Sequence, residues 1–242
     1  CLSRGLGDVY KRQLSIQIHP DDEYALENEN EYGKNEMWYV VDSEPGSYLY
    51  CGLSRDASKE EILERINNNT ITDILNKIEV KAGDVVMVKA GTIHAIGAGV
   101  FICEIQQNSN CTYRMYDYDR RDKFGNPREL HVKKALDVVD NHKYIKDNKT
   151  EVVIARNEHF TEERLVQCKY FEVYKYDVND EAKITVDEAS FVSVLFINGS
   201  GTIETDDYEK TMEFKAGDSF FVSAGLRSII VKGRATMVVT RV

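Results

Sequence analysis

Apolar and polar residues alternate along residues 14–20, which is the period-2 pattern of a half-buried β-strand. Because successive side chains of a strand point to opposite faces, Gln17 and His19 share one face and Ile16 and Ile18 share the other. Similar patterns predict further strands at 36–41, from residue 78 onward, at 101–106, and over most of the chain after residue 150. The sequence therefore predicts a mainly β protein.

Residues 58–77 have a different pattern. Their isoleucines and leucines recur three and four residues apart, which predicts two short helices inserted between strands. Residues 131–139 are predicted to form a connecting helix, and a polar stretch follows at 141–150. The charge run at 21–23 is interpreted as a solvated face.

An internal repeat divides the chain. Residues 81–91, Lys-Ala-Gly-Asp-Val-Val-Met-Val-Lys-Ala-Gly, return as residues 215–225, Lys-Ala-Gly-Asp-Ser-Phe-Phe-Val-Ser-Ala-Gly, at an offset of 134 residues. Repetition of a whole strand–turn unit indicates a duplicated β-barrel. At the same offset His94 corresponds to Ser228, so one barrel keeps an imidazole where the other has a hydroxyl.

The repeat and the helical pattern together predict the domain organisation. We expect a first, metal-binding barrel over residues 14–140, with a helical insertion near 56–77, and a second barrel without a metal site over 141–242. Residues 1–13 are basic and glycine-spaced, unlike the strand pattern that follows, and are predicted to be a non-native leader. The chain would then lack a native N-terminal segment.

Composition excludes several classes of protein. The 242 residues, 42% apolar and 30% charged, suit one large or two small globular domains. A net charge of −10 argues against general nucleic-acid binding, because clustered Lys and Arg bind phosphate backbones. No apolar run approaches the ~18 residues of a membrane span, and no signal-peptide pattern is visible, so we expect a cytoplasmic protein. The five cysteines form no CxxC pair and are expected to be reduced and structural.

Four polar side chains in the first half of the chain are candidates for a metal site. Gln17 and His19 share a strand face, Glu36 begins the next predicted strand, and His94 follows the turn at Gly91. Imidazole and carboxylate groups are zinc ligands, whereas glutamine is an unusual one. A single histidine is more often a surface or core residue than a ligand, so spacing alone leaves both interpretations open.

Several segments, in order along the chain, resemble the motifs of type I mannose-6-phosphate isomerases. Residues 14–22, Leu-Ser-Ile-Gln-Ile-His-Pro-Asp-Asp, resemble the QxHP zinc motif of that family, and residues 33–38, Gly-Lys-Asn-Glu-Met-Trp, resemble its glutamate motif. Residues 90–96, Ala-Gly-Thr-Ile-His-Ala-Ile, resemble its second histidine motif. Residues 104–114 resemble the segment with the active-site arginine, and residues 116–120 are similar to the short bacterial branch.

This resemblance implies two cupin-like (jelly-roll) β-barrels and the reversible interconversion of mannose 6-phosphate and fructose 6-phosphate. It implies a Zn²⁺ cofactor, a small-molecule sugar phosphate as partner, and an N-terminal segment that is missing here. A monomer is expected. The residues whose roles it implies are the zinc ligands Gln17, His19, Glu36 and His94, the catalytic residues Arg114 and Glu104, and Lys34 in the sugar-phosphate pocket.

The implied chemistry suits these residue types. Aldose–ketose isomerisation needs a base that moves a proton between neighbouring carbons and a cation that stabilises the developing oxyanion. Glu104 shares a strand face with Ile102 and Gln106, although a structural ion pair explains it equally well from the sequence. Lys34, taken alone, is interpreted as a solvated loop lysine. Two alternative functions stay open: an isomerase of a different sugar and a non-catalytic sugar-binding cupin.

Overall fold

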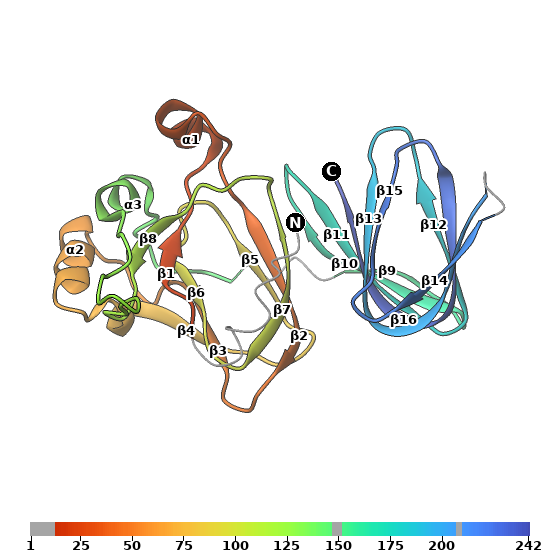
Figure 1. The fold of residues 1–242 in the computed structure, drawn as a ribbon, viewed down its shortest axis with the longest axis horizontal. Coiled ribbons are helices and arrows are strands. Elements are labelled where there is room, and N and C mark those ends of the chain that lie inside the picture. The colour runs from red at the N-terminus through yellow and green to blue at the C-terminus, as the bar shows by residue number, and fades with distance from the viewer. Residues whose placement is uncertain (1–12, 147–151, 207–209) are drawn as a thin grey trace. The chain divides into compact units, whose positions relative to one another are not determined.

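The computed structural model describes residues 13–146, 152–206 and 210–242 (Figure 1). The chain divides into two compact units, Cys1–Lys146 and Asp147–Val242. The predicted leader lies, apart from Gln13, outside the described residues. The domain limits read from the sequence stay a prediction.

The first unit contains two antiparallel sheets. Five strands pair in the order β4-β3-β6-β1-β8, and three pair in the order β5-β2-β7. Their bounds are β1 (Ile16–Ile18), β2 (Glu36–Ser43), β3 (Tyr48–Leu53), β4 (Leu75–Glu79), β5 (Val85–Val88), β6 (His94–Ile96), β7 (Val100–Gln106) and β8 (Tyr113–Tyr116).

Two apolar clusters use the two faces of the five-stranded sheet. Trp38 and Val88 from the smaller sheet pack with Leu49 and Ile96 from the larger one, which forms a core between the sheets. On the other face, Ile16 and Ile18 pack with residues of the helices. The predicted alternation along β1 is therefore confirmed, because the isoleucines face the helical side and Gln17 points between the sheets.

The helices differ in part from those predicted. The helical pattern at 58–77 corresponds to α2 (Lys59–Asn67) and a single 3₁₀ turn, η1 (Ile71–Ile74), after which β4 begins. The second predicted helix is therefore too long, because Leu75 at its end pairs with Leu53 of β3 and the chain continues as a strand. The connecting helix is α3 (Val132–Val138). No helix in the described ranges is long and apolar enough to cross a membrane.

Helix α1 (Asp22–Glu29) was not predicted. Asp21 caps its start, with Oδ1 accepting the Tyr24 N–H at 2.9 Å, and Asn30 ends it in the left-handed conformation at φ 53°. Ala25 is its buried residue, so the helix lacks the apolar stripe that reveals an amphipathic helix in a sequence. The interpretation of this charge run as solvated is wrong for Asp22, whose Oδ1 accepts the Gly33 N–H at 3.0 Å.

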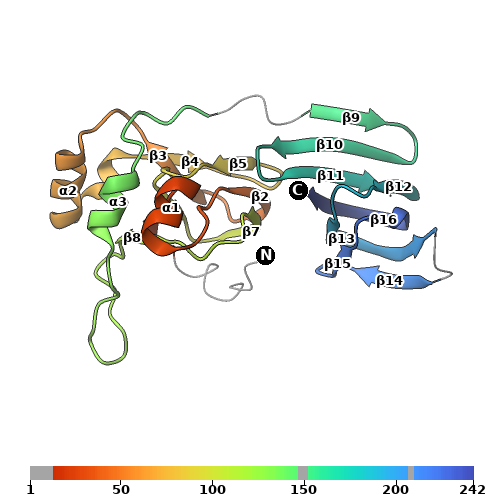
Figure 2. The ribbon, with the colours of Figure 1, turned by 90° about the horizontal axis from the view of Figure 1, so that it is seen from above.

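The second unit contains one antiparallel sheet of eight strands. Its main path is β14-β13-β16-β11-β10-β9, while β12 pairs with β16 and β15 pairs with β13. Figure 2 shows these strands from above. Their bounds are β9 (Val152–Arg156), β10 (Phe160–Gln167), β11 (Glu172–Val178), β12 (Glu181–Val186), β13 (Val192–Thr205), β14 (Thr211–Lys215), β15 (Ser219–Val222) and β16 (Arg227–Arg241).

The sequence repeat corresponds to the same turn in both units. Gly83 and Gly217 have φ of 94° and 89°, a conformation that favours glycine. In each turn an aspartate side chain accepts the lysine N–H two residues before the glycine, at 2.8 Å for Asp84 and 2.9 Å for Asp218. The two copies then form β5 and β15. The prediction of a mainly β chain with cupin-type folding is confirmed.

Candidate metal centre

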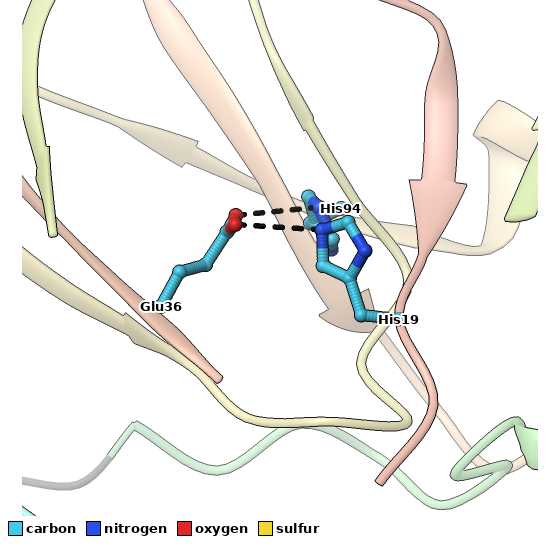
Figure 3. A group of neighbouring side chains, drawn as sticks. All are labelled: His19, Glu36 and His94. Atoms are coloured by element: carbon cyan, nitrogen blue, oxygen red, sulfur yellow. Dashed lines mark ion pairs between the residues drawn. The ribbon is translucent and has the colours of Figure 1, made fainter. Parts of the chain in front are cut away.

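Three side chains from separate segments meet inside the first unit (Figure 3). His19 follows β1, Glu36 begins β2 and His94 begins β6. Glu36 Oε2 lies 3.4 Å from His19 Nε2, and Glu36 Oε1 lies 3.4 Å from His94 Nε2. The three residues are each 1% exposed, and one ligand atom from each lies within 4.8 Å of the others. This spacing can hold one metal ion.

Main-chain carbonyl groups orient both imidazoles. His19 Nδ1 lies 2.8 Å from the Cys111 carbonyl oxygen, and His94 Nδ1 lies 2.9 Å from the Thr92 carbonyl oxygen. Since a carbonyl only accepts, each Nδ1 has the proton, and Nε2 is the nitrogen of each ring that faces Glu36. This is the arrangement of metal-binding histidines, whose second nitrogen donates to a neighbouring acceptor.

The atoms that face the centre of the cluster fit a metal ion. His19 Nε2 is buried and makes no hydrogen bond within the described part of the chain, whereas the buried Glu36 Oε2 has an ion-pair partner in Lys34 Nζ, 3.2 Å away. A buried polar atom without a partner costs roughly 1–3 kcal/mol, which a bound cation would offset. Two imidazole nitrogens and a carboxylate are a ligand set for a divalent transition metal, and they leave coordination positions open.

Gln17 approaches the cluster from β1. Its Cα pairs with that of His94 across β1 and β6, and its Nε2 lies 3.3 Å from His94 Nε2. Rotation of the amide by half a turn exchanges Nε2 with Oε1, which places the cation-binding oxygen at the same point. The structure thus brings together all four residues that the resemblance implies as ligands.

Charges around Glu36 favour the ionisation states that a metal site needs. Burial disfavours the ionised carboxylate of Glu36, but the His19 imidazole, with His94 and Lys34, outweighs burial and lowers its pKa to about 2. Burial lowers the pKa of His94 to about 4, although the charge of Glu36 opposes that shift. At neutral pH Glu36 is therefore ionised and His94 is neutral, as ligands must be.

Lys34 lies between two carboxylates. Its Nζ is 3.2 Å from Glu36 Oε2 and 3.8 Å from Glu104 Oε1, and the residue is buried. The interpretation of Lys34 as a solvated loop lysine is therefore wrong. Its backbone N–H donates to the Pro20 carbonyl at 3.0 Å, and this bond holds the segment against the chain that follows β1. Lys34 places a positive charge beside the metal centre.

Glu104 on β7 combines an ion pair with burial. Burial and the charge of Glu36 raise its pKa to about 7, while Lys34 opposes the shift. A carboxyl group that titrates near neutral pH can both take up and release a proton. Trp38, opposite Glu104 on β2, contacts the His94 ring edge to face, with 5.5 Å between the ring centroids.

Arg114 lies on β8, where its Cα pairs with that of Gln17. Residues opposite each other in an antiparallel pair share a face, so Arg114 lies on the sheet face that bears Gln17. Its Nη1 donates to the Glu129 carbonyl at 2.8 Å, and its backbone N–H donates to His131 Nδ1. Burial and nearby Arg128 lower its pKa, yet an arginine remains charged.

Sequence reasoning did not identify the groups that support the ligands. These are the carbonyls of Cys111 and Thr92 beside the histidines, and Asn35 beside Glu36, whose side chain bonds to Gln107 and to the Ala90 N–H. The carbonyls have no residue-type signal, because any amino acid supplies one. Asn35 lies inside the glutamate motif, but its partners are distant in sequence.

Comparisons with known proteins identify the family to which the chain is related. A family model described as the cupin domain of mannose-6-phosphate isomerase matches residues 161–242. YvyI of Bacillus subtilis (strain 168) is 41% identical over 238 residues, which span 96% of this chain and 72% of YvyI. The mannose-6-phosphate isomerase ManA of the same strain is 35% identical over 240 residues, which span 95% of this chain and 71% of ManA.

Solved structures of mannose-6-phosphate isomerases also match this chain. The crystal structure of the mannose 6-phosphate isomerase from Bacillus subtilis has a TM-score of 0.88 at 38% identity, covering 96% of this chain and 72% of that one. A variant of phosphomannose isomerase from Salmonella typhimurium shares the fold, with a TM-score of 0.70 at 13% identity. On the strength of its match to ManA and to the solved Bacillus subtilis enzyme, this chain belongs to the mannose-6-phosphate isomerase family.

Proposed function

We propose that this chain is a zinc-dependent aldose–ketose isomerase that interconverts mannose 6-phosphate and fructose 6-phosphate through an enediol intermediate. The supporting observation is the buried His19–Glu36–His94 cluster, in which His19 Nε2 has no hydrogen bond among the described residues. The family relationship supports the substrate, since relatives from Bacillus subtilis and Streptococcus mutans are named mannose-6-phosphate isomerases.

The residues proposed to hold zinc are Gln17, His19, Glu36 and His94. Imidazole ligands favour zinc over magnesium or calcium, which prefer oxygen ligands. When bound, zinc polarises the carbonyl and hydroxyl oxygens of a sugar and stabilises the negative charge that develops there.

Glu104 is the proposed base. The reaction moves one proton from C2 of the aldose to C1 and a second proton from the C2 hydroxyl to the C1 oxygen, so the carbonyl passes from C1 to C2 and the reaction balances without a further reactant. Ionised Glu104 takes the C2 proton, and the resulting carboxylic acid returns a proton to C1. A pKa of about 7 suits both steps, because neither protonation state is strongly favoured at neutral pH.

Two cations are proposed to complete the site. Lys34, 3.8 Å from Glu104 Oε1, favours the ionised form of the base and orients it. Arg114 presents a planar fork of N–H donors, which suits the anionic oxygens of the enediol or the phosphate. We further propose that the enzyme is a cytoplasmic monomer.

Paired histidine variants test the metal centre. His94→Ala is expected to lose bound zinc and isomerase activity together, with zinc affinity reduced more than about 100-fold because a direct ligand is removed. His142→Ala is the matched control, since His142 is exposed and pairs with Asp140. Zinc content by mass spectrometry and fructose 6-phosphate formation from mannose 6-phosphate are the measurements.

Three results would contradict parts of this proposal. Zinc-loaded wild-type protein that retains no metal would remove the central claim. Turnover of another aldose with none of mannose 6-phosphate would identify an isomerase of a different sugar. Sugar binding without turnover would identify a non-catalytic cupin.

A further inference from the structure

Asn35 lies between two residues of the proposed site but on the opposite side of the chain from the His19–Glu36–His94 cluster. Glu36 points into the cluster at the start of β2, and successive side chains of an extended segment point to opposite sides. Asn35 is half-buried, and its side-chain amide bonds to two other segments of the first unit. It therefore does not bind the metal itself.

The first of these segments is the end of β7. Gln107 Oε1 accepts both the Asn35 backbone N–H at 2.8 Å and the Asn35 Nδ2–H at 2.7 Å. The Gln107 backbone N–H in turn donates to the Asn35 carbonyl at 2.9 Å. We call these three hydrogen bonds the Asn35–Gln107 clamp. It joins the segment of Glu36 to the strand of Glu104.

The second segment leads to both histidines. Asn35 Oδ1 accepts the Ala90 N–H at 3.0 Å, just before the turn that places His94. In that turn the Gly91 N–H donates to the His19 carbonyl at 2.8 Å. One side chain thus connects the segment of Glu36 to the segment of His94, and through one further hydrogen bond to His19.

Asp22 supports the clamp from helix α1. Its Oδ1 accepts Gln107 Nε2–H at 3.2 Å and the Gly33 N–H at 3.0 Å. The Gln107 amide is consequently held from both ends, and its orientation is fixed by the network. A fixed amide sets the position of Asn35 more firmly than a mobile one would.

We propose that Asn35 is a positioning residue, which sets the distance between Glu36 and His94 and thereby the affinity for the metal. This inference rests on the proposed function, because it assumes that the cluster binds zinc. Partners outside the ligand set typically change metal affinity by about 10–100-fold when they are removed. The Asn35 amide can have such an effect because it bonds to two other segments of the first unit at once.

The test is the zinc dissociation constant, measured by competition with a chelator for the wild type, Asn35→Ala, Gln107→Ala and the double variant. Each single variant is expected to bind zinc about 10–100-fold more weakly. The double variant is expected to lose less affinity than the product of both single effects, because both substitutions break the bond between Asn35 Nδ2 and Gln107 Oε1. At saturating zinc, kcat should return to near the wild-type value.

Asn141→Ala is the matched control. Asn141 Nδ2 donates to the Ala57 carbonyl at 3.0 Å, so the variant also loses an amide bond to the main chain of the first unit. It is expected to lose stability without a change in zinc affinity. Should Asn35→Ala not fold, Gln107→Ala serves alone, since it keeps the backbone bond between the two residues.

The outcomes separate this inference from the proposed function. Wild-type protein without zinc affinity would overturn the proposed function. Wild-type protein that binds zinc, together with an Asn35→Ala variant of equal affinity, would overturn the positioning role only. An equal loss of affinity in Asn141→Ala would also overturn it, because the effect would then be a general loss of stability.

Discussion

Glu104 and Lys34 form a pair in which a buried acid titrates near neutral pH. Burial and Glu36 raise the pKa of Glu104 to about 7, and Lys34 lowers it again in part. A base acts only when it has lost its proton, so kcat is expected to fall as the pH drops below about 7. A pH profile of kcat at saturating zinc checks this, and a flat profile across neutral pH would contradict it.

Glu104→Gln removes the base while keeping the shape of the side chain. We expect kcat to fall by about 100-fold to 10,000-fold, the range typical of general acid–base groups, with zinc content unchanged. Glu79→Gln is the control, since Glu79 is an exposed glutamate of β4. Equal kcat in the two variants would remove Glu104 from the mechanism.

Lys34→Met tests the other member of the pair. Since Lys34 lowers the pKa of Glu104, its removal is expected to raise that pKa and move the acidic limb of the kcat profile to higher pH. Zinc content is measured in parallel, because Lys34 also lies 3.2 Å from Glu36 Oε2. A kcat profile that does not shift would show that the charge of Lys34 does not change the pKa of Glu104.

Residue identities indicate the ligands but not their surroundings. Two histidines, a glutamate and a glutamine in family motifs were sufficient to predict the cluster. The burial of Lys34 was not predictable, because it depends on β2 and β7 bringing Glu36 and Glu104 to the same lysine. The same holds for the pKa of Glu104, which desolvation shifts only after folding.

Periodicity was a good guide to elements that bury one face and a poor guide to the others. The strands β1 and β7 and the helix α2 were predicted from apolar spacing. Helix α1 was missed because it depends on its caps, Asp21 and Asn30, rather than on a buried stripe. The start of β4 was misplaced because short apolar runs suit a helix or a strand equally.

The contact between α1 and the approach to β2 gives a prediction for Gly33. A Cβ atom there would lie 2.3 Å from the carbonyl carbon of Asp21 and 2.4 Å from the backbone nitrogen of Asp22. Main-chain atoms cannot move aside as a flexible side chain can, so Gly33→Ala is expected to reduce the free energy of unfolding by about 1–3 kcal/mol. Urea unfolding measures this change.

Gly46→Ala is the comparison for Gly33→Ala. Gly46 has φ 80° and open space around a Cβ, so this variant reports backbone strain of about 1 kcal/mol without a steric contact. Only Gly33→Ala should also weaken zinc binding, since Gly33 donates to Asp22 beside the Asn35–Gln107 clamp. Identical effects of both variants on stability and on zinc would contradict a steric role for Gly33.

Over the whole molecule, the repeat predicted duplication but not the way in which each copy forms its sheets. β13 and β16 in the second unit have 14 and 15 residues, whereas β6, which aligns with the start of β16, has 3. Sheet pairing depends on residues far apart in sequence, and periodicity contains no information about partners. The sequence could therefore predict two barrels but not their strand orders.

Ser228 tests whether the metal chemistry belongs to one copy. It is buried at the position that corresponds to His94, and its hydroxyl donates to Asp206. Ser228→Ala is expected to cost about 1 kcal/mol of stability through that hydrogen bond and to leave zinc affinity and kcat unchanged. Loss of zinc in this variant would show that the metal site had been assigned to the wrong half of the chain.

The orientation of the two imidazoles by Cys111 and Thr92 has a consequence for how the sequences of relatives can diverge. Because a carbonyl oxygen is present whatever side chain a residue has, substitutions at these two positions do not by themselves remove the acceptors. Relatives can therefore change the amino acids around the histidines and still present the same lone pairs, provided that the path of the chain is preserved. For redesign, we expect the half-buried Thr92 to accept other side chains and the buried Cys111 to accept those of similar size, whereas insertions or deletions beside them would rotate the rings away.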